Sequence, residues 1–374
     1  MINIAAFFSF ATTYLEKYVG FWAAYLLPTC VLCIAFLHLI VWNKHLGTLT
    51  IIRKQTLALT FQVKRPPQGS VLLQAAQIIS LAIRSRHRFK AANPSYQQMH
   101  YSQMPPWTAE SLTEVQRSLK TCRVILCFAI YYLCYFQILS NIISQAGQME
   151  THGIPTDTFS CLNPIFCVIF IPTFQKILYP FLNQRHIHFG PITRMSVGFL
   201  FVAFAMAYTA ITQHIIYTHG PCYSHPLTCP AGKISNNQHR PNDINVWIQL
   251  PSHILLSIGE IFGLGSLGEH AYAEAPADIK VVLQSFCQLT GALGASLAIA
   301  LSPLCEDPWL VVVYATYAGF AGVVGLVFWA VFRRCDIRET AREGDRQEYD
   351  EMRVWWEMGH NVAIDDQLTE VERT

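Results

Sequence analysis

One carboxylate, Glu260, lies in the middle of an apolar stretch that is long enough to cross a lipid bilayer. The stretch runs from Asn245 to Pro276 and reads NVWIQLPSHILLSIGEIFGLGSLGEHAYAEAP. An ionised carboxylate at the centre of a membrane helix costs about 2.5 to 3.5 kcal/mol on insertion scales, so it should face a polar cavity or a partner rather than lipid. Binding of a positively charged nitrogen or of a proton fits this chemistry. A structural bond to another buried polar group is the alternative.

The composition predicts an integral membrane protein. Hydrophobic residues make up 52% of the chain and charged residues only 13%, whereas an average soluble domain has roughly 25% charged residues. The formal net charge of +2 is too small to indicate a nucleic-acid partner. The lipid bilayer is therefore the expected surroundings of the chain, and no nucleic acid is expected.

The apolar runs predict an all-α membrane protein with half a helix followed by seven full transmembrane helices. The first run, Ile2 to Tyr14, corresponds to roughly 20 Å of helix, which is shorter than the roughly 30 Å hydrocarbon core. The full-length runs are Gly20–Trp42, Cys122–Ser144, Cys161–Leu182, Met195–Tyr217, Val246–His270, Val281–Ser302 and Trp309–Phe332.

The charges between these runs predict the topology. Lysine and arginine greatly outnumber acids in residues 43–123, and such an excess marks the cytoplasmic side. The charged tail, residues 333–374, is then also inside, and the loop from Thr218 to Asn245 is outside. Within the inner segment, residues 71–89 form either an amphipathic helix on the inner leaflet or a soluble linker helix. Thr108 is the expected N-cap of the helix that continues into the next span.

The twelve cysteines separate by location. Cys222 and Cys229 share the outer loop with several prolines, where they form either a disulfide or two free thiols. The pair Cys30 and Cys33 lies inside an apolar span, which favours two small buried residues over a redox motif. No metal site is expected.

Several longer motifs resemble one family. The chain opens with Met1-Ile2-Asn3-Ile4-Ala5-Ala6 and continues with ATTYLEKYVGFWAAYLLP; later runs read YYLCYFQILSNIISQAGQMETHGIPTD, LNPIFCVIFIPTFQKILYPFL and NVWIQLPSHILLSIGEIF. These runs are similar to those of fungal proton-dependent oligopeptide transporters, members of the major facilitator superfamily. The match runs almost end to end and begins inside the signature of the family's fifth helix.

The resemblance implies a partial major-facilitator fold that corresponds to helices 5–12 of a twelve-helix, two-bundle transporter. Residues 1–42 would supply the end of helix five and helix six, residues 43–121 a cytoplasmic linker with an amphipathic helix, residues 122–332 the second six-helix bundle, and residues 333–374 a cytoplasmic tail. Helices one to four, with their E-x-x-E-R motif, have no counterpart in these 374 residues. We therefore expect an amino-terminally truncated fragment that does not transport on its own.

The resemblance also implies a substrate site. Asn3, Asn163 and Glu260 match polar positions of helices five, eight and ten, which together face the amino terminus of a bound peptide. Amide oxygens and a carboxylate complement an ammonium group without contacting a side chain. Asn163, which precedes Pro164, is alternatively a turn or cap at a helix start.

Further residues are expected near the site. Tyr132 stands where many relatives have a pocket tryptophan, and Cys287 occupies another position that is aromatic in bacterial relatives. Gln137 and Asn141 lie on a polar helix face, for which hydrogen bonding between helices and cavity lining are the two alternatives.

The resemblance thus implies proton-coupled transport of short peptides of two or three residues, driven by a proton gradient without a cofactor, in the plasma membrane. The chain is not expected to be an enzyme, because its spans hold no cluster of nucleophile, base and metal ligands. The alternatives are a membrane assembly partner of a full-length transporter and a seven-helix receptor.

Overall fold

The structure is a computed structural model that describes the chain except for residues 1–2, 4–5, 7–8, 53–70, 86–88, 103–104, 186, 188, 227, 236–237, 276–278 and 334–374. The predicted charged tail, apart from Arg333, lies outside the described residues, as does part of the predicted linker. Within the described residues, seven helices are long and apolar enough to cross a membrane, which confirms the predicted number.

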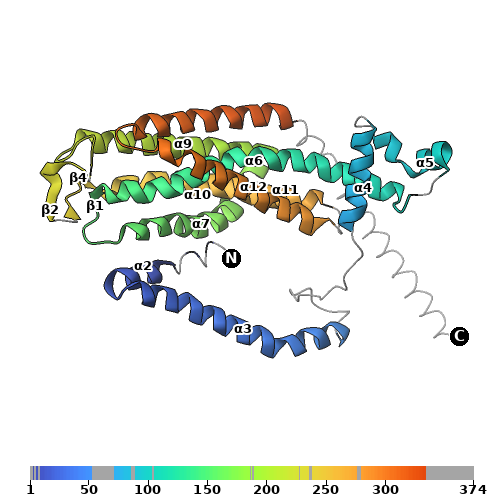
Figure 1. Ribbon diagram of the computed structural model, residues 1–374, viewed down its shortest axis with the longest axis horizontal. Coiled ribbons are helices and arrows are strands. Elements are labelled where there is room, and N and C mark those ends of the chain that lie inside the picture. The colour runs from blue at the N-terminus through green and yellow to red at the C-terminus, as the bar shows by residue number, and fades with distance from the viewer. Residues whose placement is uncertain are drawn as a thin grey trace.

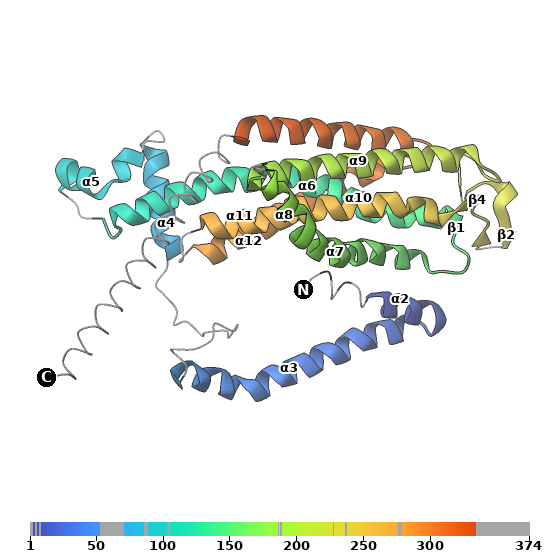
Figure 2. The same cartoon turned by 180° about the vertical axis from the view of Figure 1, so that it is seen from behind.

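The amino-terminal part is a helical hairpin of α2 (Ser9–Tyr18) and α3 (Phe21–Ile52). The two helices pack against each other, and Gly20 between them has a φ of +123°, a backbone conformation that favours glycine. Between Phe21 and Val41 only Ala23 and Ala24 are buried. Figures 1 and 2 show α3 extending beside the bundle of the other helices.

The remaining six spans form the bundle, in which α6 and α12, and α9 and α10, pack most extensively. Its elements are α6 (Ala109–Gly147), α7 (Leu162–Thr173), η3 (Phe174–Leu178), α8 (Tyr179–Gln184), α9 (Pro191–Thr218), α10 (Leu250–Glu260), η6 (Ile261–Gly265), α11 (Ser266–Glu274), α12 (Lys280–Leu301) with η7 (Ser302–Leu304), and a last helix, Leu310–Arg333. Four aromatic rings, those of Phe128, Tyr131, Phe199 and Phe328, pack against one another in the bundle core, mostly edge to face.

The segment before the bundle, predicted to be cytoplasmic, packs on α6 rather than standing free. It consists of α4 (Val71–Arg84), η1 (Phe89–Ala92) and α5 (Pro94–Tyr101). Ile78 and Ala82 of α4 are buried, and Ile78 belongs to the same core cluster as the residues of α6. The apolar face of this amphipathic helix is thus partly covered by protein, while Leu73 and Ile83 are exposed, so both alternatives for this helix stay predictions.

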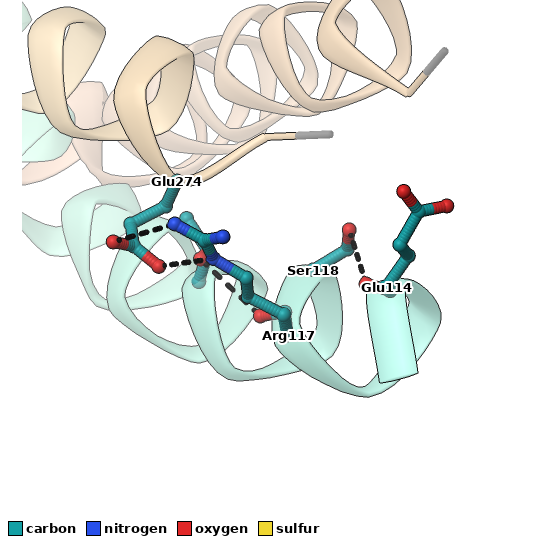
Figure 3. A network of polar contacts seen from close by, with 5 residues as sticks. Glu114, Arg117, Ser118 and Glu274 are labelled. Carbon is teal, nitrogen blue, oxygen red and sulfur yellow. Dashed lines mark hydrogen bonds and ion pairs between the residues drawn. The ribbon is translucent and has the colours of Figure 1, made fainter. Parts of the chain in front are cut away.

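The amino-terminal end of α6 is fixed by a side-chain cap and by an ion pair. The hydroxyl of Thr108 accepts a hydrogen bond from the backbone N–H of Ser111 at 3.2 Å, as predicted for the N-cap. Two turns further on, Arg117 donates from Nε and Nη2 to the two carboxylate oxygens of Glu274 at 2.8 and 3.2 Å. Figure 3 shows this two-pronged ion pair joining α6 to the end of α11.

At the opposite end of the bundle, the outer loop is folded into small strands. Strand β1 (Met149–Glu150) pairs in parallel with β4 (Asn242–Asn245), and β2 (Lys233–Ser235) pairs antiparallel with β3 (Gln238–His239). Two short helices, η4 (Pro230–Gly232) and η5 (Val246–Gln249), complete the loop. A disulfide joins Cys222 to Cys229, so the first of the two alternatives for these cysteines is confirmed.

Buried glutamines link the helices beneath this outer loop in a head-to-tail chain. Each amide nitrogen donates to the next oxygen, in the order Gln249, Gln145, Gln213, Gln148 and Asp307. The second carboxylate oxygen of Asp307 accepts the hydroxyl of Tyr217. Polar side chains in membrane proteins commonly hydrogen-bond across helices in this way. The chain ties together α6, α9, η5 and the turn before the last helix.

A glycine sets the distance between α6 and α12. A Cβ atom at Gly294 would lie 2.4 Å from Cβ of Tyr132 and 2.8 Å from the carbonyl oxygen of Ala129. The backbones of the two helices are therefore too close for any side chain here. Small residues allow such close approach between membrane helices.

We expect Gly294→Ala to lower the free energy of unfolding by about 1 to 3 kcal/mol, because the added methyl group must push the two helices apart. Thermal unfolding of the detergent-solubilised protein measures this loss. Gly319→Ala is the matched control, since a Cβ there meets no atom within 4 Å. An equal loss in both variants would contradict the close-approach explanation.

We expect Asp307 to make stability fall as pH rises. Burial raises the pKa of its carboxyl above the ordinary value of 3.8, so the folded state binds a proton more tightly than the unfolded state. The stability that this tighter binding adds is present at low pH and is lost as the pH rises through the raised pKa. Asp307→Asn should therefore gain stability relative to wild type as pH rises from about 4 to about 7. Unfolding midpoints across this range test it, with Asp157→Asn, at an exposed acid of η2 (Thr156–Cys161), as the control that keeps the wild-type slope.

Candidate functional site

Glu260 ends α10 and directly precedes a π-helical turn, η6. Such π-turns are frequent at functional sites. The turn also permits unusually close packing on both sides: a Cβ at Gly263 would lie 2.7 Å from the ring of Tyr131, and one at Gly198 of α9 would lie 2.5 Å from the backbone nitrogen of Gly263. The segment that carries Glu260 is therefore held tightly between α6 and α9.

The carboxylate of Glu260 is held by donors from two other helices. Its Oε2 accepts the hydroxyl of Tyr135, on α6, at 2.8 Å and the amide Nδ2 of Asn163, on α7, at 2.7 Å. Hydrogen bonds to a carboxylate are stronger than those between neutral groups. The site is thus the meeting point of three helices that are far apart in the sequence.

Asn163 is itself positioned from α10. It is buried, with 3% of its surface exposed, and Ser257 Oγ lies 2.7 Å from its Oδ1 and 3.1 Å from its backbone oxygen. Asn163 is the second residue of α7, whose N-cap is Cys161 without a side-chain cap bond. The cap alternative for Asn163 is therefore wrong, because its side chain reaches across to α10.

The two oxygens of the Glu260 carboxylate differ in their surroundings. Both donors contact Oε2, and neither contacts Oε1. The thiol of Cys167, on α7, also hydrogen-bonds the carboxylate. Glu260 is half-buried rather than buried, and it forms no ion pair with a described lysine, arginine or histidine. Oε1 is therefore taken up by neither Tyr135 nor Asn163 and can receive a proton or an ammonium group.

The other predicted site residues lie in different surroundings. Asn3 precedes α2, is half-buried, and has no hydrogen bond to Asn163 or Glu260 among the described residues. Tyr132 packs against α12, with its ring 3.4 Å from where a Cβ of Gly291 would lie. Cys287, also on α12, is buried with 4% exposed. Their roles in a cavity remain predictions.

Gln137 joins α6 to α12, and Asn141 bonds to Gln137 within α6. The amide of Gln137 donates to the carbonyl oxygen of Ala298 at 2.8 Å, and its Oε1 accepts from Asn141 at 2.9 Å. Gln137 has only 3% of its surface exposed. These contacts support hydrogen bonding between helices, the first of the two alternatives for this polar face.

Tyr135 and Ser257 are the site residues that the sequence analysis missed. Ser257 lies one turn before Glu260 on α10, and Tyr135 lies one turn after Tyr131 and Tyr132 in the run YYLCY. These spacings place each residue on a helix face but do not identify a partner on another helix. Nothing in the sequence pairs Tyr135 with an acid 125 positions away.

Comparison with known proteins finds one matching family and several similar transporters. A family model described as PTR2, POT family, matches residues 1–317. The peptide transporter imqD of Aspergillus flavus is 45% identical over 271 residues, which cover 72% of this chain and 66% of that protein. The peptide transporter PTR2 of Saccharomyces cerevisiae is 34% identical over 351 residues, which cover 94% of this chain and 53% of that protein. The chain thus spans about half to two-thirds of the length of these relatives.

Solved structures share the fold. The POT family transporter PepTSo superimposes with a TM-score of 0.61 over 90% of this chain and 70% of that chain, at 18% identity. An auto-inhibited POT family peptide transporter gives a TM-score of 0.59 over 89% of this chain and 68% of that chain, also at 18% identity. The expected partial major-facilitator fold is confirmed by these matches.

We expect Tyr135 and Glu260 to be energetically coupled. Tyr135→Phe removes one donor from Oε2 and should lower the free energy of unfolding by about 1 to 3 kcal/mol. In the Glu260→Gln background the same change should cost clearly less, giving a coupling of at least about 0.5 kcal/mol. Thermal unfolding of the four proteins of this double-mutant cycle measures the coupling, and additive effects would show that the bond contributes nothing.

Proposed function

The chain belongs to the POT family, and on this basis we propose that it takes part in the transport of peptides of two or three residues, coupled to protons, across the plasma membrane. Its relatives are named as transporters, which agrees with the prediction that it is not an enzyme. The match does not favour the assembly-partner or receptor alternatives. The proton gradient, rather than a bound cofactor, is the proposed driving force.

The six-helix bundle is proposed to hold the amino end of the peptide. The observation that carries this assignment is the Glu260 carboxylate itself, whose Oε2 accepts from Tyr135 and Asn163 while Oε1 accepts from neither. An ammonium group donates to Oε1 while Tyr135 and Asn163 keep Oε2 in place. Because the donors are supplied by two other helices, the carboxylate is oriented before the ligand arrives, and a preorganised site loses less entropy on binding.

A site that binds only the amino group makes no contact that depends on the side chains of the peptide. An ammonium is common to every unblocked peptide, so a site built on Glu260 tolerates varied sequences. Asn163 and Asn3 are proposed to contribute further amide oxygens on the same side. Tyr132 and Cys287 are proposed to shape the neighbouring pocket.

Proton coupling is proposed to act through the same oxygen. A carboxylate that has taken up a proton on Oε1 no longer presents a negative charge to an ammonium group. Proton and peptide amine therefore influence each other's binding at Glu260, and linkage of this kind is reciprocal. This accounts for an ionisable residue inside a span, where a charge is otherwise costly.

We expect Glu260→Gln to weaken dipeptide binding by about tenfold to a hundredfold, the effect of losing a charge-assisted hydrogen bond. Binding rather than uptake is measured, by calorimetry on the detergent-solubilised chain, because binding reports on this half of the site directly. Glu269→Gln is the matched control, since the Glu269 side chain is 65% exposed and pairs with Arg194.

An amino-blocked ligand separates amine recognition from other effects. N-acetylated dipeptide should bind wild type more weakly than the free dipeptide, and Glu260→Gln should cause no additional loss with it. If Glu260→Gln weakened the binding of both ligands equally, the carboxylate would not be the group that binds the peptide amine.

A further inference from the structure

One face of α2 carries a row of polar side chains that all contact the same segment of the bundle. Ser9, Thr13 and Lys17 follow one another at every fourth position, so they lie in line on the helix surface. Ser9 Oγ lies 3.1 Å from Sγ of Cys161, and Thr13 Oγ1 lies 3.2 Å from Oγ1 of Thr158. Lys17 Nζ donates to the backbone oxygen of Gly153.

The three partners belong to one connection, residues 153–161, which leads from β1 through η2 to α7. This connection follows the outer end of α6, on the opposite side of the membrane from the basic segment 43–123. Figures 1 and 2 both show α2 at the end of the molecule where the small strands lie, next to the start of α7. The contact is therefore at the outer end of the bundle.

The hairpin touches the bundle mainly through this outer contact. The helix α2 packs on η2, whereas α3 packs chiefly on α2. Between Phe21 and Val41 the buried residues are Ala23 and Ala24, close to the turn, and the rest of that stretch is exposed. Contact between the two parts of the molecule is thus concentrated at one end.

The chemistry of the contact suits repeated opening. No residue of α2 is buried, so separating the helix from the connection exposes little apolar surface. The bonds that break are hydroxyl, thiol and ammonium contacts, which water can replace. A ligand shifts such an equilibrium easily, because the two states differ by a small free energy.

We propose that the row Ser9, Thr13 and Lys17 and the connection 153–161 form an outer latch that is closed in this structure and separates when the peptide site opens to the outside. This inference rests on the proposed function, because alternating access requires the two halves to part on one side while they meet on the other. In this chain, the latch residues make the contact that parts at the outer end.

The contact itself is tested by a single substitution. Ser9→Cys places a thiol next to the native thiol of Cys161, and copper phenanthroline with oxygen takes up the two electrons and two protons as the disulfide forms. The product is detected by peptide mapping under non-reducing conditions. Thr12→Cys is the matched control, because the Thr12 hydroxyl bonds within α2, whereas that of Ser9 also contacts Cys161. Cross-linking of Ser9→Cys no faster than that of Thr12→Cys would overturn the latch.

The opening is tested on the wild-type chain by alkylation with a membrane-impermeant maleimide. Cys161 has 2% of its surface exposed and lies behind α2, whereas Cys134 has none exposed and lies in the bundle core. An opening latch should make Cys161 react at least tenfold faster than Cys134, and Thr13→Val should raise the Cys161 rate further without changing that of Cys134. If Cys161 is as unreactive as Cys134, the contact is permanent and the proposal fails.

Neither test depends on peptide binding, so the latch and the proposed function fail separately. A cross-link together with fast alkylation of Cys161 supports the latch even if the calorimetric test of Glu260 is negative. Conversely, binding of a dipeptide through Glu260 with an unreactive Cys161 leaves the proposed site intact and removes the latch.

Discussion

The interaction on which the rest of the structure depends is the hydrogen bonding of one carboxylate within a membrane-spanning bundle. An ionisable group in such a place requires polar partners, because lipid offers none. Glu260 obtains them from Tyr135 and Asn163, and Ser257 in turn positions Asn163. Three helices must therefore keep a fixed register for the carboxylate to be satisfied.

That register is maintained by two kinds of contact that are spread over the bundle. Glycines bring the backbones close together, as at Gly294 between α6 and α12 and at Gly198 against Gly263. Buried amides then hydrogen-bond across the helices, as in the glutamine chain that ends at Asp307. In lipid, close packing and hydrogen bonds replace the hydrophobic effect as the forces that hold helices together.

The hairpin of α2 and α3 is attached on a different principle. Its contact with the connection 153–161 is polar and leaves α2 without a buried residue, whereas the bundle core is aromatic and closed. The same chain thus combines a tightly packed bundle with a neighbouring hairpin that meets it through polar contacts.

The spans and the local signals were predictable from the sequence, because each depends on residues that are close together in the chain. Apolar length gave the seven spans, and Thr108 was recognisable as a cap from its position before an apolar run. The paired cysteines of one short loop suggested the disulfide that Cys222 and Cys229 form. Glu260 stood out for the same reason, as an acid within an apolar stretch.

The partners of Glu260 depended on the tertiary structure alone. Helical periodicity places Tyr135 on a face of α6 but does not determine which of the other helices covers that face. Only the packing of the bundle brings its hydroxyl to an acid 125 residues further along, and only the packing directs both donors to Oε2 rather than Oε1. The sequence by itself therefore determined that a carboxylate lies within an apolar span, and the fold decided which of its oxygens accepts from Tyr135 and Asn163, because contacts between distant helices are set by shape and not by spacing along the chain.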